Sequence, residues 1–214
     1  FADFDDVFNV FVELMREPAF REDKIPLAKQ QLNTQIARRN DDIFEIADRQ
    51  GMKLAYGAAS PYARVAEYDT VAAVTRDDLV AWHRNTVNPN NMILGIVGDF
   101  DPRAMEAKLK EAFTSWPKGP EVKKAEVAFP DPKPGVYFIQ KDDVNQSAIR
   151  MLHLGTTRDN PDYYAIEVLN EFFGGSFASR LFSSIRSKKG LAYYVWGTVG
   201  TAYVRGLEGA GIVA

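Results

Sequence analysis

The chain has 214 residues, 46% of them hydrophobic and including 14 Phe and 9 Tyr, so it can bury a substantial core and is predicted to fold rather than to be disordered. Its formal net charge of −3 excludes a binder of nucleic acid or of anionic membranes, because both partners need a basic protein surface. The absence of cysteine excludes disulfides, thiolate nucleophiles and cysteine-ligated zinc, and it is compatible with either periplasm or cytoplasm. No apolar run reaches the roughly 18 residues that a membrane-spanning helix requires.

Apolar residues that recur on one helix face predict a largely helical first half of the chain. The first predicted helix covers Phe4–Met15 and is ended by Pro18, whose ring cannot continue a helix. A second helix is predicted to begin within Asp23–Pro26, and a third to cover Ile43–Leu54. Thr75–Asp78 has the residue types of a capping box, with Asp in the acidic position, and predicts a further helix after it.

A proline-rich stretch divides the chain. Before it, the apolar run Met92–Val97 predicts a buried strand, and Asp101–Pro102 predicts a helix start in which Asp is the cap. Residues 117–134 contain five of the 11 prolines, and proline holds a chain extended and removes backbone donors. We therefore predict a stiff linker at 117–134 between a domain over 1–116 and a second domain over 135–214.

The second half is predicted to mix strands, helices and a hairpin. Two strands, Gly135–Lys141 and Ser147–Leu154, are expected around a turn at 142–145, and Asn160–Pro161 is expected to cap a helix that Gly174–Gly175 ends. A short helix over Phe177–Arg186, closed by Gly190, and a hairpin of Tyr193–Val204 and Leu207–Val213 through Arg205–Gly206 complete the prediction. Helices mixed with hairpins, without regular βαβ units, predict an α+β fold with mixed or antiparallel sheets packed against helices.

An ordered series of motifs resembles the second domain of the insulinase/pitrilysin metallopeptidase family, also called inverzincins. The motifs are Gly174-Gly175-Ser176, Ser179-Arg180-Leu181-Phe182, Ile185-Arg186 and Gly190-Leu191-Ala192-Tyr193. Upstream segments fit as well: Pro18-Ala19-Phe20, Tyr62-Ala63-Arg64, Thr75-Arg76-Asp77-Asp78-Leu79 and Val97-Gly98-Asp99-Phe100. The resemblance implies parts of two such α/β domains joined by the proline-rich linker. Since the sequence does not begin with Met, we expect it to be a piece of a longer protein.

The resemblance also implies that the zinc site of the family is lost. Family members bind zinc through His-x-x-Glu-His and a glutamate on a later long helix, the second of two glutamates spaced by seven. Aligned through Pro18-Ala19-Phe20, those two positions are Ala28 and Gln35. A glutamine offers only a neutral carbonyl oxygen, which is a poor third ligand for a divalent cation. Neither His83 nor His153 begins the His-x-x-Glu-His motif, and each is interpreted as a packed or surface histidine.

An arginine and a tyrosine spaced by seven are expected to bind substrate. In the family's second domain such a pair contacts the peptide, and Arg186 and Tyr193 match it. The resemblance implies that Arg186 binds a substrate carbonyl or carboxylate and that Tyr193 donates a hydrogen bond to the carbonyl under attack, where an oxyanion develops. Without the motif, Arg186 would be read as a cation at a helix C-terminus and Tyr193 as an ordinary strand aromatic.

We therefore predict a non-catalytic subunit or domain, inactive on its own, that binds extended peptide and completes the active site of a partner. The expected partner is a catalytic paralogous subunit that carries the zinc, as in mitochondrial processing peptidases and bacterial two-gene peptidases, and no cofactor is expected in this chain. Two alternatives stay open. The first is an active zinc endopeptidase whose His-x-x-Glu-His half lies outside the sequence, and the second is a structural or assembly subunit.

Overall fold

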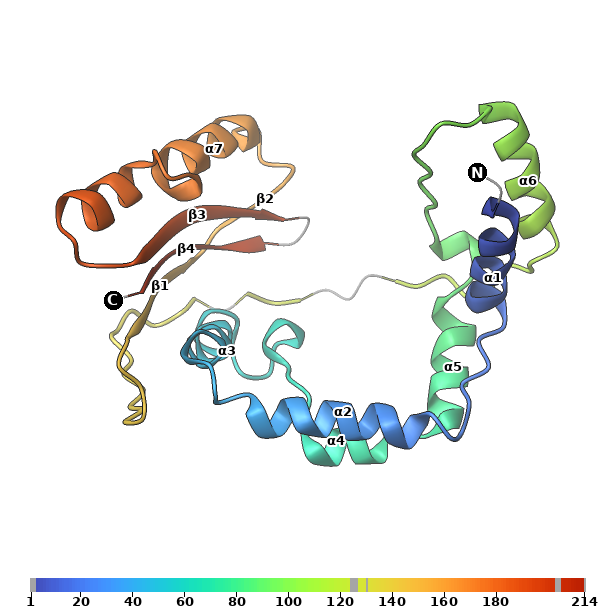
Figure 1. The fold of residues 1–214 in the computed structure, drawn as a ribbon, viewed down its shortest axis with the longest axis horizontal. Coiled ribbons are helices and arrows are strands. Elements are labelled where there is room, and N and C mark those ends of the chain that lie inside the picture. Colours follow the sequence, from blue (N-terminus) through green and yellow to red (C-terminus); the bar gives the residue numbers. More distant parts are fainter. Residues whose placement is uncertain (1–2, 124–126, 130, 203–204, 214) are drawn as a thin grey trace. The chain divides into compact units, whose positions relative to one another are not determined.

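The computed structural model describes residues 3–123, 127–129, 131–202 and 205–213 (Figure 1). Contacts divide the chain into two compact units, one of residues 1–36 with 66–126 and one of residues 37–65 with 127–214. Most described elements are helices, and a single four-stranded sheet lies in the second unit. The expectation of a fold that mixes helices with strands is confirmed, and the sheet is small. The predicted boundary at 117–134 stays a prediction.

Helices form the first unit, at the positions that periodicity predicted. They are α1 (Phe4–Arg16), α2 (Ile25–Arg38), α4 (Tyr68–Ala73), α5 (Arg76–Thr86) and α6 (Pro102–Thr114), with a short 3₁₀ turn η2 at Pro89–Asn91. Predicted caps are in place, because the Thr75 hydroxyl accepts from the Asp78 amide and the Asp101 carboxylate accepts from the Arg103 and Ala104 amides. None of the helices in the described part of the chain is long and apolar enough to cross a lipid bilayer.

Aromatic packing joins α1 to α6, and a histidine contact joins α1 to α5. Phe8 is buried and meets Phe113 of α6 edge-on, with ring centroids 6.5 Å apart. Arg16, in the last turn of α1, donates a hydrogen bond of 3.1 Å to the carbonyl of Ala112. His83 of α5 lies 2.9 Å from the carbonyl oxygen of Met15 through Nε2. The C-terminal end of α1 is therefore held by both neighbouring helices.

Two predicted strands are wrong. Residues 92–97 and 135–141 are not strands in the structure, and Ile93, Val97 and Val136 are almost fully exposed, at 103%, 101% and 99%. A strand is stable only when a neighbouring strand pairs with its backbone, and no described segment pairs with either stretch. Apolar residues in a row therefore did not suffice to predict a strand.

The second unit is built on one sheet. Its strands are β1 (Ala148–Leu154), β2 (Thr156–Thr157), β3 (Tyr194–Ala202) and β4 (Arg205–Val213), in the order β1-β4-β3-β2. β4 pairs antiparallel with both β1 and β3, whereas β2 pairs parallel with β3. The hairpin of β3 and β4 is confirmed, but the turn predicted at Arg205–Gly206 is wrong, because β4 already begins at Arg205 and Thr201 is paired with it.

Helices cover both faces of this sheet (Figure 1). α3 (Ile43–Tyr56) packs on β1, where Gly51 leaves no room for a Cβ beside Leu152. α7 (Tyr163–Asn170) continues into the π-helical turn η3 (Glu171–Gly175), and η4 (Phe182–Lys188) follows. Gly174 and the side chain of Leu181 contact Gly197 of β3, on the side of the strand opposite to Trp196. The unit is a layer of strands between two helical layers.

The helix around Asn160 starts later than predicted. α7 begins at Tyr163, and its N-cap residue, Asp162, makes no side-chain capping bond. Asn160 instead accepts a hydrogen bond of 2.8 Å from the Asp162 amide and so forms the turn before the helix. The short helix predicted over Phe177–Arg186 is present as η4, which begins at Phe182, and Gly174–Gly175 ends the preceding helical stretch as expected.

Candidate functional site

The two residues predicted to bind substrate lie together in the second unit. The Arg186 guanidinium carbon is 5.2 Å from the centroid of the Tyr193 ring and 4.7 Å from that of Phe182. Both distances are within the range of cation–π attraction, in which the negative face of a ring holds the cation. Tyr193 is 75% exposed, whereas Phe182 is buried. The guanidinium thus has a buried ring and a solvent-facing ring as neighbours.

Local backbone geometry sets this arrangement. The buried hydroxyl of Ser179 accepts a hydrogen bond from the Phe182 amide, at the start of the helical turns that carry Arg186. At the other end Gly190 has φ of +62°, in the left-handed region that side chains disfavour. Its amide donates to the Arg186 carbonyl, at 3.1 Å, and the chain then reverses toward Tyr193. A helix end and a glycine turn therefore bring residues seven apart in sequence face to face.

Arg186 pairs with no carboxylate of the described residues. The contacts that its guanidinium makes at 4.7 and 5.2 Å are with uncharged rings. The side chain is half-buried, so part of its donor edge is open to solvent. A guanidinium presents five N–H donors in a plane that matches a carbonyl or carboxylate. The arrangement can therefore bind an acceptor group of a ligand.

Sequence analysis missed the aromatic part of this site. Phe182 lies four residues before Arg186, a spacing that places two side chains on one side of a helix and could have indicated the contact. Phe177 meets Phe182 edge-on, with centroids 4.9 Å apart, and is 74% exposed. No periodic signal identified Phe177, because it precedes the helical turns. We call Phe177, Phe182, Arg186 and Tyr193 the aromatic–arginine cluster.

The residues described do not fit a zinc site. Gln35 and Ala28 lie exposed on α2, in the first unit, and neither carries a negative charge. His83 contacts the Met15 carbonyl, and His153 lies 2.7 Å from the carbonyl of Leu154 through Nδ1. Among the side chains that the structure describes, no group of three or more His, Cys, Asp or Glu could hold a metal ion. No chemical step is therefore assigned to a metal on these residues.

Comparison with known proteins identifies the family. The family model described as "Peptidase M16 inactive domain" matches residues 73–213. An uncharacterized zinc protease of Mycobacterium leprae is 26% identical over 182 residues, which are 81% of this chain and 40% of that protein. A Bacillus subtilis protein named "Probable inactive metalloprotease YmfF" is 25% identical over 188 residues, covering 86% of this chain and 44% of that protein. The chain thus spans less than half the length of these relatives.

Comparison with solved structures gives the same family and fold. The crystal structure of a peptidase M16 inactive domain from Pseudomonas fluorescens superposes with a TM-score of 0.90 at 27% identity, over 98% of this chain and 51% of that one. A protease from Helicobacter pylori matches the fold with a TM-score of 0.81 at 19% identity, over 100% of this chain and 52% of the other. The resemblance inferred from the glycine and arginine motifs is confirmed.

Proposed function

Because this chain belongs to the peptidase M16 family and matches its inactive domain, we propose that it forms part of a metal-free subunit that binds extended peptide and completes the active site of a zinc-bearing partner. Arg186 and Tyr193 are the residues proposed to contact the peptide. The partner is proposed to be a paralogous catalytic subunit. On its own, the chain is proposed to have no peptidase activity.

The observation that carries this proposal is the guanidinium of Arg186, which lies against two aromatic rings and, within the described ranges, forms no ion pair. Cation–π contacts at 4.7 and 5.2 Å fix its orientation without occupying its N–H donors, which lie in the plane of the group. A guanidinium that is already oriented before the ligand arrives loses little conformational entropy on binding, which favours affinity. Peptide carbonyls and carboxylates are the acceptors that a peptidase substrate provides.

Tyr193 supports a role close to the bond under attack. Its ring is 75% exposed, so its hydroxyl is free to meet a ligand at the surface rather than a buried partner. A fixed donor next to a carbonyl stabilises the negative charge that develops on the oxygen during attack. Arg186 is proposed to hold the peptide, and Tyr193 to act on the reacting carbonyl through hydrogen bonding.

The loss of acidic side chains on α2 supports the metal-free part of the proposal. The positions aligned with the family's two glutamates are Ala28 and Gln35, and a neutral amide cannot replace the charge of a carboxylate ligand. A relative named a probable inactive metalloprotease is consistent with such a loss. The competing proposal is an active zinc endopeptidase, which the names of other relatives as zinc proteases favour.

Reconstitution of the intact protein separates these proposals. We expect the purified full-length protein to contain no stoichiometric zinc and to cleave no fluorogenic peptide, and to gain activity when mixed with its zinc-bearing paralogue. Arg186→Ala should abolish that gain, whereas Lys188→Ala, which removes an exposed cation from the same helix, should not. Zinc at one equivalent with hydrolysis by the protein alone would establish the active endopeptidase. Unchanged activity of the Arg186→Ala complex would point to an assembly subunit.

A further inference from the structure

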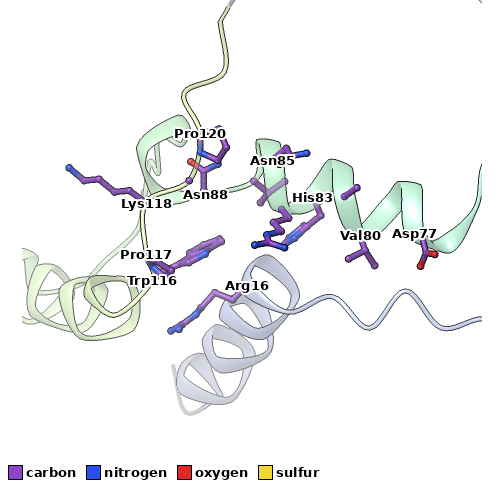
Figure 2. A pocket seen from close by; sticks show the side chains of 14 residues that line it. Arg16, Asp77, Val80, His83, Asn85, Asn88, Trp116, Pro117, Lys118 and Pro120 are labelled. Atoms are coloured by element: carbon purple, nitrogen blue, oxygen red, sulfur yellow. The ribbon is translucent and has the colours of Figure 1, made fainter.

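The first unit contains a cavity of about 760 Å³ (Figure 2). Its walls come from the end of α1, from α5 and the turn that follows it, and from the segment 116–120 after α6. Arg16, Arg84, Asn88 and Lys118 are among the residues that line it, and Figure 2 shows the Lys118 side chain extending away from the other labelled residues. The proposed function uses none of these residues.

The cavity carries an excess of positive charge. Three permanently or normally charged cations, Arg16, Arg84 and Lys118, line it, against a single carboxylate from Asp77. Within the described ranges of the chain, none of the three cations forms an ion pair; Arg16 donates only to the Ala112 carbonyl and the Ser115 hydroxyl. Three cations against one carboxylate leave a local excess of positive charge, which favours an anionic ligand.

Asn88 adds an unsatisfied amide to this wall. The residue is 2% exposed, and for the described part of the chain neither its side-chain nitrogen nor its oxygen has a hydrogen-bond partner. A buried amide that lacks both a donor and an acceptor partner is disfavoured, and each such group calls for an explanation. The backbone of Gly119 packs directly on it, since a Cβ there would lie 2.5 Å from the Asn88 amide nitrogen.

Two neighbouring asparagines show what such a carboxamide can bind. The Asn90 side chain accepts from the Gly119 amide at 3.0 Å and donates to the Gly119 carbonyl at 3.3 Å. Asn91 donates to the Pro120 carbonyl at 2.8 Å and accepts from the Val122 amide at 3.1 Å. Each of these two side chains binds the extended backbone of 119–122 with one donated and one accepted hydrogen bond. Asn88 is the third carboxamide of the same turn.

The geometry points to a binding site for a carboxylate that adjoins a peptide group, as found at the carboxyl terminus of a peptide. The carboxylate would meet Arg84, which is exposed, and Lys118 once its exposed side chain turns toward the cavity, and Arg16 also lines this space. The adjoining peptide group would take the place of the Gly119 backbone against the Asn88 amide, which requires the 117–120 segment to give up its hydrogen bonds to Asn90 and Asn91. Trp116 and the flanking prolines give the rest of the wall an apolar surface for a side chain.

Calorimetric titration of the full-length protein tests this site with three probes at low salt. The probes are N-acetyl-trialanine as the free acid, the same peptide as the carboxamide, and an N-acetylated carboxamide with aspartate in the middle. We expect the free acid to bind about tenfold or more tightly than its carboxamide, and binding to weaken as salt rises. The aspartate probe identifies the source of the carboxylate, because equal binding to it would assign the site to acidic side chains.

Variants separate the amide from the cations. Asn88→Leu keeps the volume but removes both polar atoms, so it should weaken free-acid binding about tenfold without lowering the thermal midpoint, because no hydrogen bond is lost. Arg84→Gln and Lys118→Gln are exposed and should each weaken binding several-fold. Lys110→Gln on α6, outside the cavity, is the control. Equal affinity for acid and carboxamide, or wild-type affinity of the folded Asn88→Leu chain, would overturn the proposal.

Discussion

Gly174 of η3 and Gly197 of β3 approach each other so closely that a Cβ on Gly174 would overlap the backbone nitrogen, Cα and oxygen of Gly197. Backbone atoms cannot rotate away as a flexible side chain can, so the helical layer itself would have to move. We predict that Gly174→Ala lowers the free energy of unfolding by about 1–3 kcal/mol, as overpacking of a tight contact does. Denaturant unfolding followed by circular dichroism measures this.

Gly95→Ala is the matched control, because no heavy atom lies within 4 Å of a Cβ built at Gly95 and the residue is exposed. Its free energy of unfolding should stay within about 0.5 kcal/mol of the wild type. Equal effects of the two substitutions would mean that the contact with Gly197 is not what disfavours a side chain at Gly174.

Local signals predicted the helices well and the sheet only in part. The capping box at Thr75–Asp78 and the Asp101–Pro102 start depend on residues a few positions apart, so the sequence alone identifies them. Strand pairing depends on distant segments, and this is why 92–97 and 135–141 carried a strand pattern without a strand partner. The grouping of 37–65 with the sheet has the same origin, because contacts such as that of Gly51 with Leu152 have no local signal.

The candidate site was predictable to the extent that it follows a motif. The spacing of Arg186 and Tyr193 came from the family resemblance, and the contact between them is present. The position of Phe177 depends on the turn between η3 and η4, and π-helical turns have no simple periodic signature. The cavity beside Asn88 was not predicted either, because its walls come from three segments that only the fold brings together.

Arg150 of β1 joins the sheet to α3 through Asp48, and the contribution of this pair to stability can be measured. Its side chain is only 9% exposed, pairs with Asp48 at 2.5 Å, and stacks 5.3 Å from Phe44 and 5.5 Å from Trp196. Asp48→Ala would leave the buried guanidinium without its carboxylate. Because Asp48 is 59% exposed, solvent screens the pair, and we predict a loss of only about 1–2 kcal/mol.

Arg150→Ala should cost more, about 2–4 kcal/mol, since it also removes packing between the two rings. A double-mutant cycle with Asp48→Ala isolates the coupling between the two side chains. Additive effects of the two substitutions would contradict an interaction that links helix and strand.

Asn170 secures β3 where its register shifts. The Asn170 carboxamide accepts from the Val199 amide at 2.7 Å and donates to the Val199 carbonyl at 3.1 Å, next to the irregularity between Val199 and Thr201. Bulged residues lose ladder partners, and this side chain replaces them. Asn170→Ala should therefore cost about 1–3 kcal/mol and speed hydrogen exchange at the Val199 amide. Protection of that amide at the wild-type level would contradict the role.

The capping box of α5, formed by Thr75 and Asp78, should be weakened at acid pH. The Thr75 hydroxyl donates to Asp78 Oδ2 at 2.6 Å and the Thr75 amide donates at 2.8 Å, and these bonds lower the pKa of Asp78 below its ordinary 3.8. A lowered folded-state pKa means that the charged form is favoured by folding. The charged Asp78 carboxylate thus contributes fully to folding stability above pH 3.8. This contribution is lost as the pH falls through the lower pKa that Asp78 has in the folded state.

NMR titration of the Asp78 carboxyl carbon checks this direction. In Thr75→Val, which keeps the shape but removes the hydroxyl, the pKa of Asp78 should rise toward its ordinary value, and the α5 amides should exchange faster. An unchanged titration of Asp78 in this variant would show that the hydroxyl does not set the shift.

Substitution of Tyr193 distinguishes two proposed roles, binding the peptide and stabilising the carbonyl oxygen under attack. Tyr193→Phe keeps a ring over the Arg186 guanidinium and removes only the hydroxyl. In the reconstituted complex proposed above, we expect kcat to fall about 100-fold with little change in KM, because a donor to a developing oxyanion acts in the transition state. Arg186→Gln should instead raise KM, since it removes binding that the ground state already uses. Steady-state kinetics with a fluorogenic peptide measures both constants. Because Tyr193 is 75% exposed, neither stability nor subunit assembly should change in Tyr193→Phe, and a fall in activity explained by lost assembly would refute the assignment.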